Sequence, residues 1–241
     1  MLFNSYPFLL LFLPVALLGF FGLARLDRRY AAAWLTAASL FFYGWWSPTY
    51  VVLLAASIAF NYLVGLAIAR ASTDRVRLTL LAGGIGTNLA VLAYYKYAGF
   101  IVSQIFRLPG AVDGAGPILP LGISFFTFTQ IAFLVDVRRG LAREYSLIHY
   151  SLFVTYFPHL IAGPVLHHKE MMPQFAREQT YRPEAQNFSV GLTMLALGLF
   201  KKVVLADGCA AATAAVFDVA SPATRTFFAA WTGALSYTLQ I

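Results

Sequence analysis

The chain alternates between long apolar runs and short polar segments that are rich in arginine. Residues 1–24 and 31–69 contain no charged side chain. About 20 apolar residues are enough to cross the hydrocarbon core of a bilayer as a helix. The pattern therefore predicts an all-α fold, a polytopic bundle of transmembrane helices. The expected helices span residues 6–24, 31–46, 50–69, 78–97, 118–136, 186–206 and 224–241.

The run over residues 31–69 is too long for one helix, and the segment WWSPTY (45–50) divides it. Pro48 lacks a backbone donor and clashes with the preceding turn, so a helix is not expected to run through it. Tryptophan and tyrosine favour the boundary between lipid and water. We therefore expect a turn at one membrane surface here.

The first apolar run could be mistaken for a secretory signal peptide. Such a peptide carries Lys or Arg before its apolar core, whereas here Arg25, Arg28 and Arg29 follow it. Because short basic loops favour the cytoplasm, we expect a retained first helix with its N-terminus outside. Helix alternation then places two further arginine loops, around residues 70–77 and 138–143, on the same cytoplasmic side.

Residues 145–166 look long enough to cross the membrane, yet a full crossing would put the basic segment 167–184 outside. Pro158 and the pair Gly163-Pro164 interrupt this stretch. Irregular backbone is tolerated at membrane depth where protein or a watery cavity surrounds it. We therefore predict a re-entrant segment near residues 153–166, with 167–184 cytoplasmic or interfacial.

Composition agrees with a membrane protein. The chain has 60% hydrophobic and 11% charged residues, a net charge of +7 and a mean hydropathy of +0.71, whereas soluble domains carry about 25% charged residues. The basic residues lie in separate loops and form no continuous basic face. We therefore expect membrane lipids, and no nucleic acid, as partners. The single Cys209 excludes an intramolecular disulfide and a cysteine-based metal cluster.

His159 lies in the apolar stretch FVTYFPHLIAGP (153–164). An ionisable side chain inside a membrane usually marks a functional site or a structural joint. It could act as a general base toward a substrate hydroxyl. It could instead be a structural histidine that packs between helices with its ring nitrogens hydrogen-bonded. The neighbouring Pro158, Gly163 and Pro164 favour a position that lines a cavity.

Several further patterns have a structural reading beside a functional one. The glycines of GGIGTN (83–88) fit helix packing, because no strand precedes them and no P-loop lysine follows. His167-His168 lack a carboxylate partner at helical spacing, so we expect no metal site. Asp136 is expected to pair with Arg138 or Arg139 at the membrane boundary.

The pair Lys201-Lys202 stands between the apolar stretches LALGLF and VVLA. Long lysine side chains can extend to the membrane surface and anchor a helix there. The same side chains could instead attract an anionic donor molecule or lipid headgroup. Both readings stay open.

Four segments follow one another along the chain: PLGISFFTFTQIAFLVDVRRG (120–140), FVTYFPHLIAGPVLHH (153–168), GLFKKVVLAD (198–207) and WTGALSYTLQI (231–241). In this order they resemble the membrane-bound O-acyltransferase family, in its bacterial alginate O-acetyltransferase branch. The opening MLFNSYPFLLLFLPV, the FFYGWWSP region and the AYYKYAGF region also fit, so the resemblance covers essentially the whole chain.

The resemblance implies a multi-pass enzyme of the bacterial inner membrane. It would move an acyl group, acetyl first of all, from a cytoplasmic donor such as acetyl-CoA or another acetyl carrier toward an extracytoplasmic polysaccharide such as alginate. Periplasmic acetyl-transfer proteins would be its partners. The family's catalytic histidine lies beyond the matched region, so the resemblance implies no catalytic residue within 1–241. His159, Gly163 and Pro164 are carried over as elements of the core that line the acyl path.

On this reading, residues 1–241 form a single transmembrane domain, the N-terminal part of a longer one, cut within a helix and inactive alone. Two other classes stay open. Broken helices with polar groups also suit a transporter or flippase of a small or lipid-linked substrate, although no repeated half is visible. A non-catalytic membrane subunit or a truncated remnant is the third reading.

Overall fold

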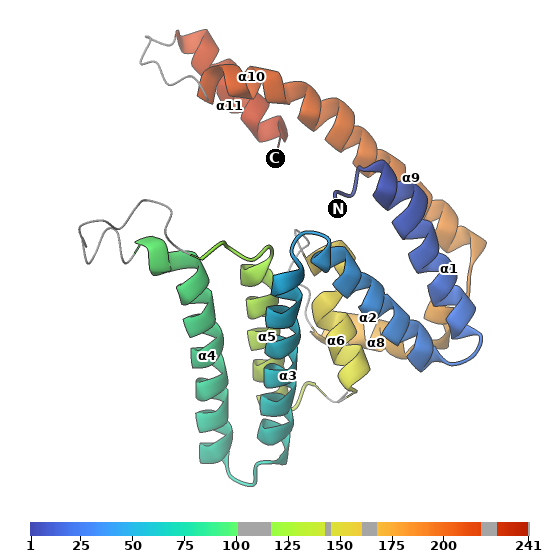
Figure 1. The fold of residues 1–241 in the computed structure, drawn as a ribbon, viewed down its shortest axis with the longest axis vertical. Helices are drawn as coiled ribbons and strands as arrows, with labels where there is room; N and C mark the ends of the chain where they lie inside the picture. Colours follow the sequence, from blue (N-terminus) through green and yellow to red (C-terminus); the bar gives the residue numbers. More distant parts are fainter. Residues whose placement is uncertain (101–116, 143–145, 161–167, 218–225, 241) are drawn as a thin grey trace. The chain divides into compact units, whose positions relative to one another are not determined.

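The computed structural model describes residues 1–100, 117–142, 146–160, 168–217 and 226–240. Within these ranges the regular structure is helical throughout, without a strand (Figure 1). Four helices are long and apolar enough to cross a membrane, and this confirms the predicted all-α polytopic bundle. They are Pro7–Ala24, Pro48–Arg70, Asp74–Gly99 and Ala185–Phe217.

The chain divides into two compact units, each described here by itself. The first comprises Met1 and Pro14–Arg182, and the second comprises Leu2–Leu13 and Pro183–Ile241. The helices of the first unit are α1 (Leu13–Ala24), α2 (Arg28–Gly44), α3 (Pro48–Arg70), α4 (Asp74–Phe100), α5 (Ile123–Arg138), α6 (Leu147–Thr155), α7 (Phe157–Leu160), α8 (His168–Ala176) and the short 3₁₀ helix η3 (Glu178–Tyr181).

Helix ends in the first unit follow from local residues. Asp27 caps α2, since its carboxylate accepts a hydrogen bond from the Arg29 backbone N–H at 2.7 Å. The next helix begins at Pro48, after an extended Ser47. Proline suits a first helical position because its missing N–H would have no partner there. The predicted division of residues 31–69 at WWSP is therefore confirmed.

Helices α3, α4 and α5 run side by side, with α4 antiparallel to the other two (Figure 1). At one end of these helices, Arg138 of α5 lies 3.5 Å from Asp74 of α4. We give the name basic end to the side of the first unit to which alternation of the helices assigns the arginines of residues 25–29, 70–77 and 138–139.

The opposite end of the same helices is aromatic. The Tyr43 hydroxyl donates to the Leu121 carbonyl at 3.0 Å, and the Tyr50 hydroxyl donates to the Ile118 carbonyl. The rings of Tyr50 and Tyr95 lie edge to face at 6.2 Å. Tyrosines with their hydroxyls paired to backbone suit a membrane interface. One end therefore carries arginines and the other carries tyrosines, as the predicted alternation of helices requires.

Glycine lets these helices approach closely. A Cβ atom at Gly84 would lie 2.8 Å from the Leu134 side chain, and one at Gly65 would lie 2.8 Å from the Phe133 ring. At Gly83 and Gly86 a Cβ atom would meet nothing within 4 Å. Gly84 is thus the glycine of GGIGTN that performs the predicted helix packing.

The segment after the re-entrant stretch is more regular than expected. Residues 167–184 read as a loop in the sequence, whereas the structure forms α8 and then η3. The physical reason is amphipathic spacing, because Met171, Met172 and Phe175 bury one face of α8 in the core.

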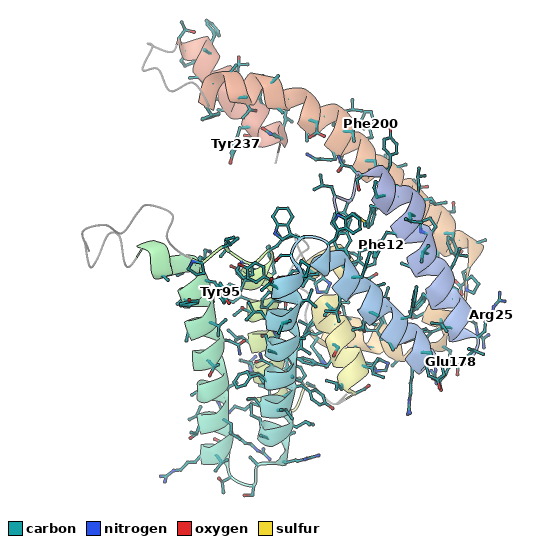
Figure 2. All side chains as sticks on the ribbon, viewed as in Figure 1. Phe12, Arg25, Tyr95, Glu178, Phe200 and Tyr237 are labelled. Atoms are coloured by element: carbon teal, nitrogen blue, oxygen red, sulfur yellow. The ribbon has the colours of Figure 1, made fainter. Side chains whose placement is uncertain are left out.

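Helix α8 and η3 are fixed to the basic end of the first unit. The Arg28 guanidinium donates to the carbonyl of Ala176, the last residue of α8, at 3.4 Å. The Phe20 and Tyr181 rings stack at 5.4 Å. Figure 2 shows Arg25 and Glu178 at the same corner of the unit. The predicted placement of 167–184 on the side of the first arginine cluster agrees with these contacts.

The chain therefore leaves α5 at the basic end and returns to that end at α8. Between them, α6 has nine residues, or about 14 Å at 1.5 Å per residue, against a hydrocarbon core of about 30 Å. A return of this kind is what the predicted re-entrant segment near 153–166 requires. Residues 161–167 of that segment lie outside the described ranges.

The second unit is built on one long helix. Helix α9 (Ala185–Phe200), the π-helical segment η4 (Lys201–Ala206) and α10 (Asp207–Phe217) are continuous, and together they span 33 residues. The helix thus extends well past the predicted end at residue 206. The unit also contains the π-helical segment η1 (Pro7–Phe12) and the last helix, α11 (Phe227–Gln240).

Helix α11 packs closely on α10. A Cβ atom at Gly233 would lie 2.5 Å from a Val216 methyl group, so the glycine allows a contact that a side chain would block. The Phe217 and Tyr237 rings lie 5.7 Å apart. The predicted apolar helix at the end of the sequence is confirmed, with its first helical residue at Phe227.

The membrane side of η3 can be tested by cysteine labelling. In a Cys209→Ala background, Gln179→Cys is expected to resist an impermeant maleimide added to intact cells, as Ser72→Cys in the loop between α3 and α4 also does. Trp46→Cys, at the opposite end of the helices, is expected to react. Labelling of the Gln179→Cys protein together with the Trp46→Cys protein would refute the re-entrant topology.

Candidate functional site

The predicted break before His159 is present and has a clear local cause. Helix α6 ends at Tyr156, whose φ and ψ of −49° and 106° are not helical. Helix α7 then starts with Phe157 and Pro158, and the Tyr156 carbonyl accepts its first hydrogen bonds, from the N–H groups of His159 and Leu160 at 3.1 Å. Proline fits this first turn because no intrahelical acceptor awaits its nitrogen.

A side chain from another helix satisfies the backbone at this break. The Phe157 N–H donates to the Ser39 hydroxyl of α2 at 3.3 Å, in a buried position. The Ser39 hydroxyl in turn donates to the Leu35 carbonyl at 2.7 Å. An unpaired backbone N–H away from water costs several kcal/mol in lipid, so Ser39 stabilises the interruption that places His159.

His159 lies in the core, with 7% of its surface exposed. Its imidazole ring is 5.8 Å from the Tyr156 ring and 6.5 Å from the Phe153 ring. The Nδ1 atom has no hydrogen-bond partner among the described residues. A neutral imidazole in this setting can accept a hydrogen bond from a buried hydroxyl or water.

A second buried histidine lies close to the same phenylalanine. His168, at the start of α8, is 5.4 Å from the Phe153 ring and 5.3 Å from the Phe133 ring. Phe153 therefore contacts both imidazoles. We define His159, Phe153, His168, Phe133 and Tyr156 as the histidine–aromatic cluster.

Metal binding by this cluster has no support in the described part of the chain. No group of three or more His, Cys, Asp or Glu side chains there is arranged to hold a metal ion. His167, the neighbour that the sequence pairs with His168, lies outside the described residues, as do Gly163 and Pro164. The proposed lining role of that glycine and proline stays a prediction.

A chain of uncharged polar side chains leads to the cluster from α3. The Gln130 amide donates to the Ser57 hydroxyl at 2.9 Å and accepts from the Tyr150 hydroxyl at 3.2 Å. The Tyr150 ring then lies 4.3 Å from the ring of Phe133. Gln130 is fully buried. These contacts tie α3, α5 and α6 together around the histidine–aromatic cluster.

A second polar contact joins α3 to α4. Asn61 and Asn88 exchange side-chain hydrogen bonds at 3.1 and 2.7 Å, and each also donates to a carbonyl of its own helix. Sequence reasoning missed Gln130, Asn61 and Asn88. Their signal was available, because an uncharged amide inside an apolar helix needs a partner across the helix interface.

Asp136 differs from its predicted pairing. Arg138 pairs with Asp74 instead, since residues two apart in an α-helix lie about 200° apart around its axis. Asp136 is buried, and one of its carboxylate oxygens has no hydrogen-bond partner among the described residues. Its backbone carbonyl accepts hydrogen bonds from the N–H groups of Leu141 and Ala142.

In the second unit, Lys202 is paired and Lys201 is exposed. The Lys202 ammonium lies 2.5 Å from the Asp207 carboxylate. Residues five apart lie about 140° apart around an α-helix, but they lie one turn apart in a π-helix, whose hydrogen bonds run between such residues. The π-helical turn of η4 and this ion pair therefore support each other.

A multi-pass helix bundle with buried histidines and amides defines a membrane protein with a polar interior. Comparison with known proteins identifies the class more closely. The model of the membrane-bound O-acyltransferase family, MBOAT, matches residues 32–240. The chain belongs to this family.

The relatives carry names from bacterial acyl transfer. The chain is 37% identical to the peptidoglycan O-acetyltransferase of Helicobacter pylori, over all of this chain and 51% of the relative. It is 40% identical to the probable alginate O-acetylase AlgI of Pseudomonas aeruginosa, over all of this chain and 46% of the relative. A teichoic acid D-alanyltransferase of Lacticaseibacillus rhamnosus is 25% identical over 50% of this chain and 27% of the relative.

The chain spans about half the length of the curated relatives it matches. No solved structure matches it.

The ion pair of η4 generates a test by charge exchange. A lone Lys or Asp at the centre of a membrane helix costs about 2.5–3.5 kcal/mol on insertion scales. Lys202→Met and Asp207→Leu are therefore each expected to lower the amount of folded protein that remains after extraction in mild detergent and heating. The exchange Lys202→Asp with Asp207→Lys is expected to recover most of that loss.

Lys201→Met is the matched control for this test, since Lys201 is the exposed neighbour, and it is expected to behave like the unaltered chain. The readout is the monodisperse fraction in fluorescence-detected size exclusion. An exchange variant no better than the single variants would show that the pair does not hold the π-helical turn.

Proposed function

We propose that this chain is part of a membrane-bound O-acyltransferase that transfers an acyl group, acetyl first of all, toward an extracytoplasmic polysaccharide. The observation that carries the proposal is the family match over residues 32–240. Support for the acceptor comes from the names of relatives, which refer to alginate and to peptidoglycan. Both are glycan polymers, and alginate is the first acceptor to test.

In the proposed chemistry, the residues that form the scaffold of the site differ from the residue that reacts. A histidine would take the proton of an acceptor hydroxyl as that oxygen attacks the acyl carbon of a thioester or a covalent acyl carrier. The donor would be acetyl-CoA or another acetyl carrier. We assign no catalytic residue within 1–241. His159 takes the role of a core residue beside the acyl path, together with Gly163 and Pro164.

Burial of His159 among aromatic rings supports a scaffold role for it. Lys201, exposed on the long helix of the second unit, remains a candidate contact for an anionic donor or lipid. For Lys202 the same role requires release from Asp207. We further propose a location in the bacterial inner membrane, with periplasmic proteins that complete the transfer.

Deletion of the reading frame that contains this chain separates an acyltransferase from a transporter and from an inactive remnant. Ester-linked acetate and total exported polysaccharide are both measured. For an acyltransferase, acetate per mass of polysaccharide is expected to fall at least about tenfold, while the mass stays constant. The intact gene supplied on a plasmid is expected to restore the acetate.

A transporter or flippase would instead lower the exported mass at a constant acetate ratio. A non-catalytic remnant would change neither quantity. Either of these results would refute the proposed acyl transfer.

A further inference from the structure

Two arginine-bearing segments that are about 150 residues apart in the sequence meet at the basic end of the first unit. Arg28 hydrogen-bonds the carbonyl of Ala176 at 3.4 Å, and Arg177 is the next residue along the chain. Stacking of Phe20 on Tyr181 fixes the same junction from the side of α1. Figure 2 shows this corner with Arg25 labelled. The fold thus gathers arginines that the sequence keeps separate.

The charges at this junction do not balance. We define the arginine junction as the segments 25–29 and 177–182, which contain five arginines and two carboxylates and so carry a net charge of +3. Asp27 is engaged as the cap of α2, and Glu178 pairs with Arg182 at 3.7 Å. Arg25, Arg29 and Arg177 are exposed, and none of the three has an ion-pair partner among the described residues.

The chemistry of the junction favours a phosphate-bearing ligand. All five cations are arginines, whose planar guanidinium groups present paired donors that match two phosphate oxygens. Two large apolar side chains of the same turn, Leu26 and Tyr30, are 75% and 60% exposed. Arginines beside exposed apolar and aromatic side chains at a helix end are typical of the boundary between headgroups and acyl chains.

We propose that the arginine junction binds the phosphate headgroup of an acidic phospholipid. Arg25, Arg29 and Arg177 would contact the phosphate, while Leu26 and Tyr30 would lie against the adjoining glycerol and acyl chains. Arg28 acts differently, because it holds α8 in place. This site is independent of the proposed acyl transfer and would exist whatever reaction the chain takes part in.

A second basic cluster offers a matched control. Arg70, Arg75 and Arg139 are also exposed and lie at the same end of the first unit. In that cluster, Asp74 of α4 pairs with Arg138 of α5 at 3.5 Å. Removing three arginines from either cluster changes the net charge equally, so a difference between the two variants reports the arrangement rather than the charge.

The test measures lipid binding by the purified full chain. Nanodiscs or detergent micelles with phosphatidylglycerol are compared with ones that contain phosphatidylcholine, and bound lipid is counted by native mass spectrometry. Each arginine near an anionic surface contributes about fivefold in affinity. The triple variant Arg25→Gln, Arg29→Gln, Arg177→Gln is therefore expected to lose at least about tenfold in retained phosphatidylglycerol. The triple variant Arg70→Gln, Arg75→Gln, Arg139→Gln is expected to lose measurably less phosphatidylglycerol than the junction variant does.

Two further arms keep the test decisive. A variant with Arg→Lys at 25, 29 and 177 keeps the charge but loses the paired donors, and an intermediate loss is expected. If the triple Gln variant fails to fold, Arg29→Gln alone is measured, with a loss of about fivefold expected. Glycerol phosphate at millimolar concentration is expected to leave the lipid bound.

Equal losses in the two triple variants would overturn the proposal, since general surface charge would then explain the binding. No loss in the junction variant would also overturn it. Complete displacement by glycerol phosphate would identify a soluble phosphate compound as the ligand and would refute a lipid site.

Discussion

A polar group inside a lipid-embedded helix bundle has to find its partner within the protein, and this requirement organises the structure. The break at Tyr156 is possible because the Ser39 hydroxyl accepts the freed N–H of Phe157. The fully buried Gln130 pairs with Ser57 and Tyr150. In the second unit, Lys202 pairs with Asp207 across a π-helical turn. In each of these three places, an interruption of regular helix or apolar surface is matched by a partner within the protein.

The same requirement gives the histidine–aromatic cluster its character. Helices α3, α5 and α6 are joined by hydrogen bonds around it, and α8 closes it from the basic end with His168. Because several helices restrain the side chains of this cluster, the cluster can act as a rigid scaffold. Rigid scaffolds position reactive groups accurately. The Nδ1 atom of His159 has no hydrogen-bond partner among the described residues, and in the neutral ring it can accept one hydrogen bond.

Most of the fold could be predicted from the sequence, because length and apolarity determine a membrane helix. The division at Pro48 and the break near Pro158 followed from backbone chemistry. Helix α8 could not be predicted so well, since its apolar face at Met171, Met172 and Phe175 has meaning only against a core formed by distant helices. The partner of Arg138 was also hidden, because Asp74 comes from another helix.

The candidate site was less accessible from sequence than the fold. His159 stood out as an ionisable residue in an apolar stretch, but the sequence could not show that Phe153 lies close to both His159 and His168. The arginine junction depends on contacts between residues about 150 positions apart, as between Arg28 and Ala176. Local spacing carries no information about such contacts.

We propose that His159 belongs to the scaffold of an acyl-transfer site and is not its reactive group. The direct measurement is the acetate content of exported polysaccharide in cells that lack the gene and carry a His159→Gln copy of it, with the protein level in the membrane measured alongside. We predict that acetylation continues at a reduced level, within about tenfold of the unaltered gene. Complete loss of acetylation at a normal protein level would contradict this account and would make His159 part of the chemistry.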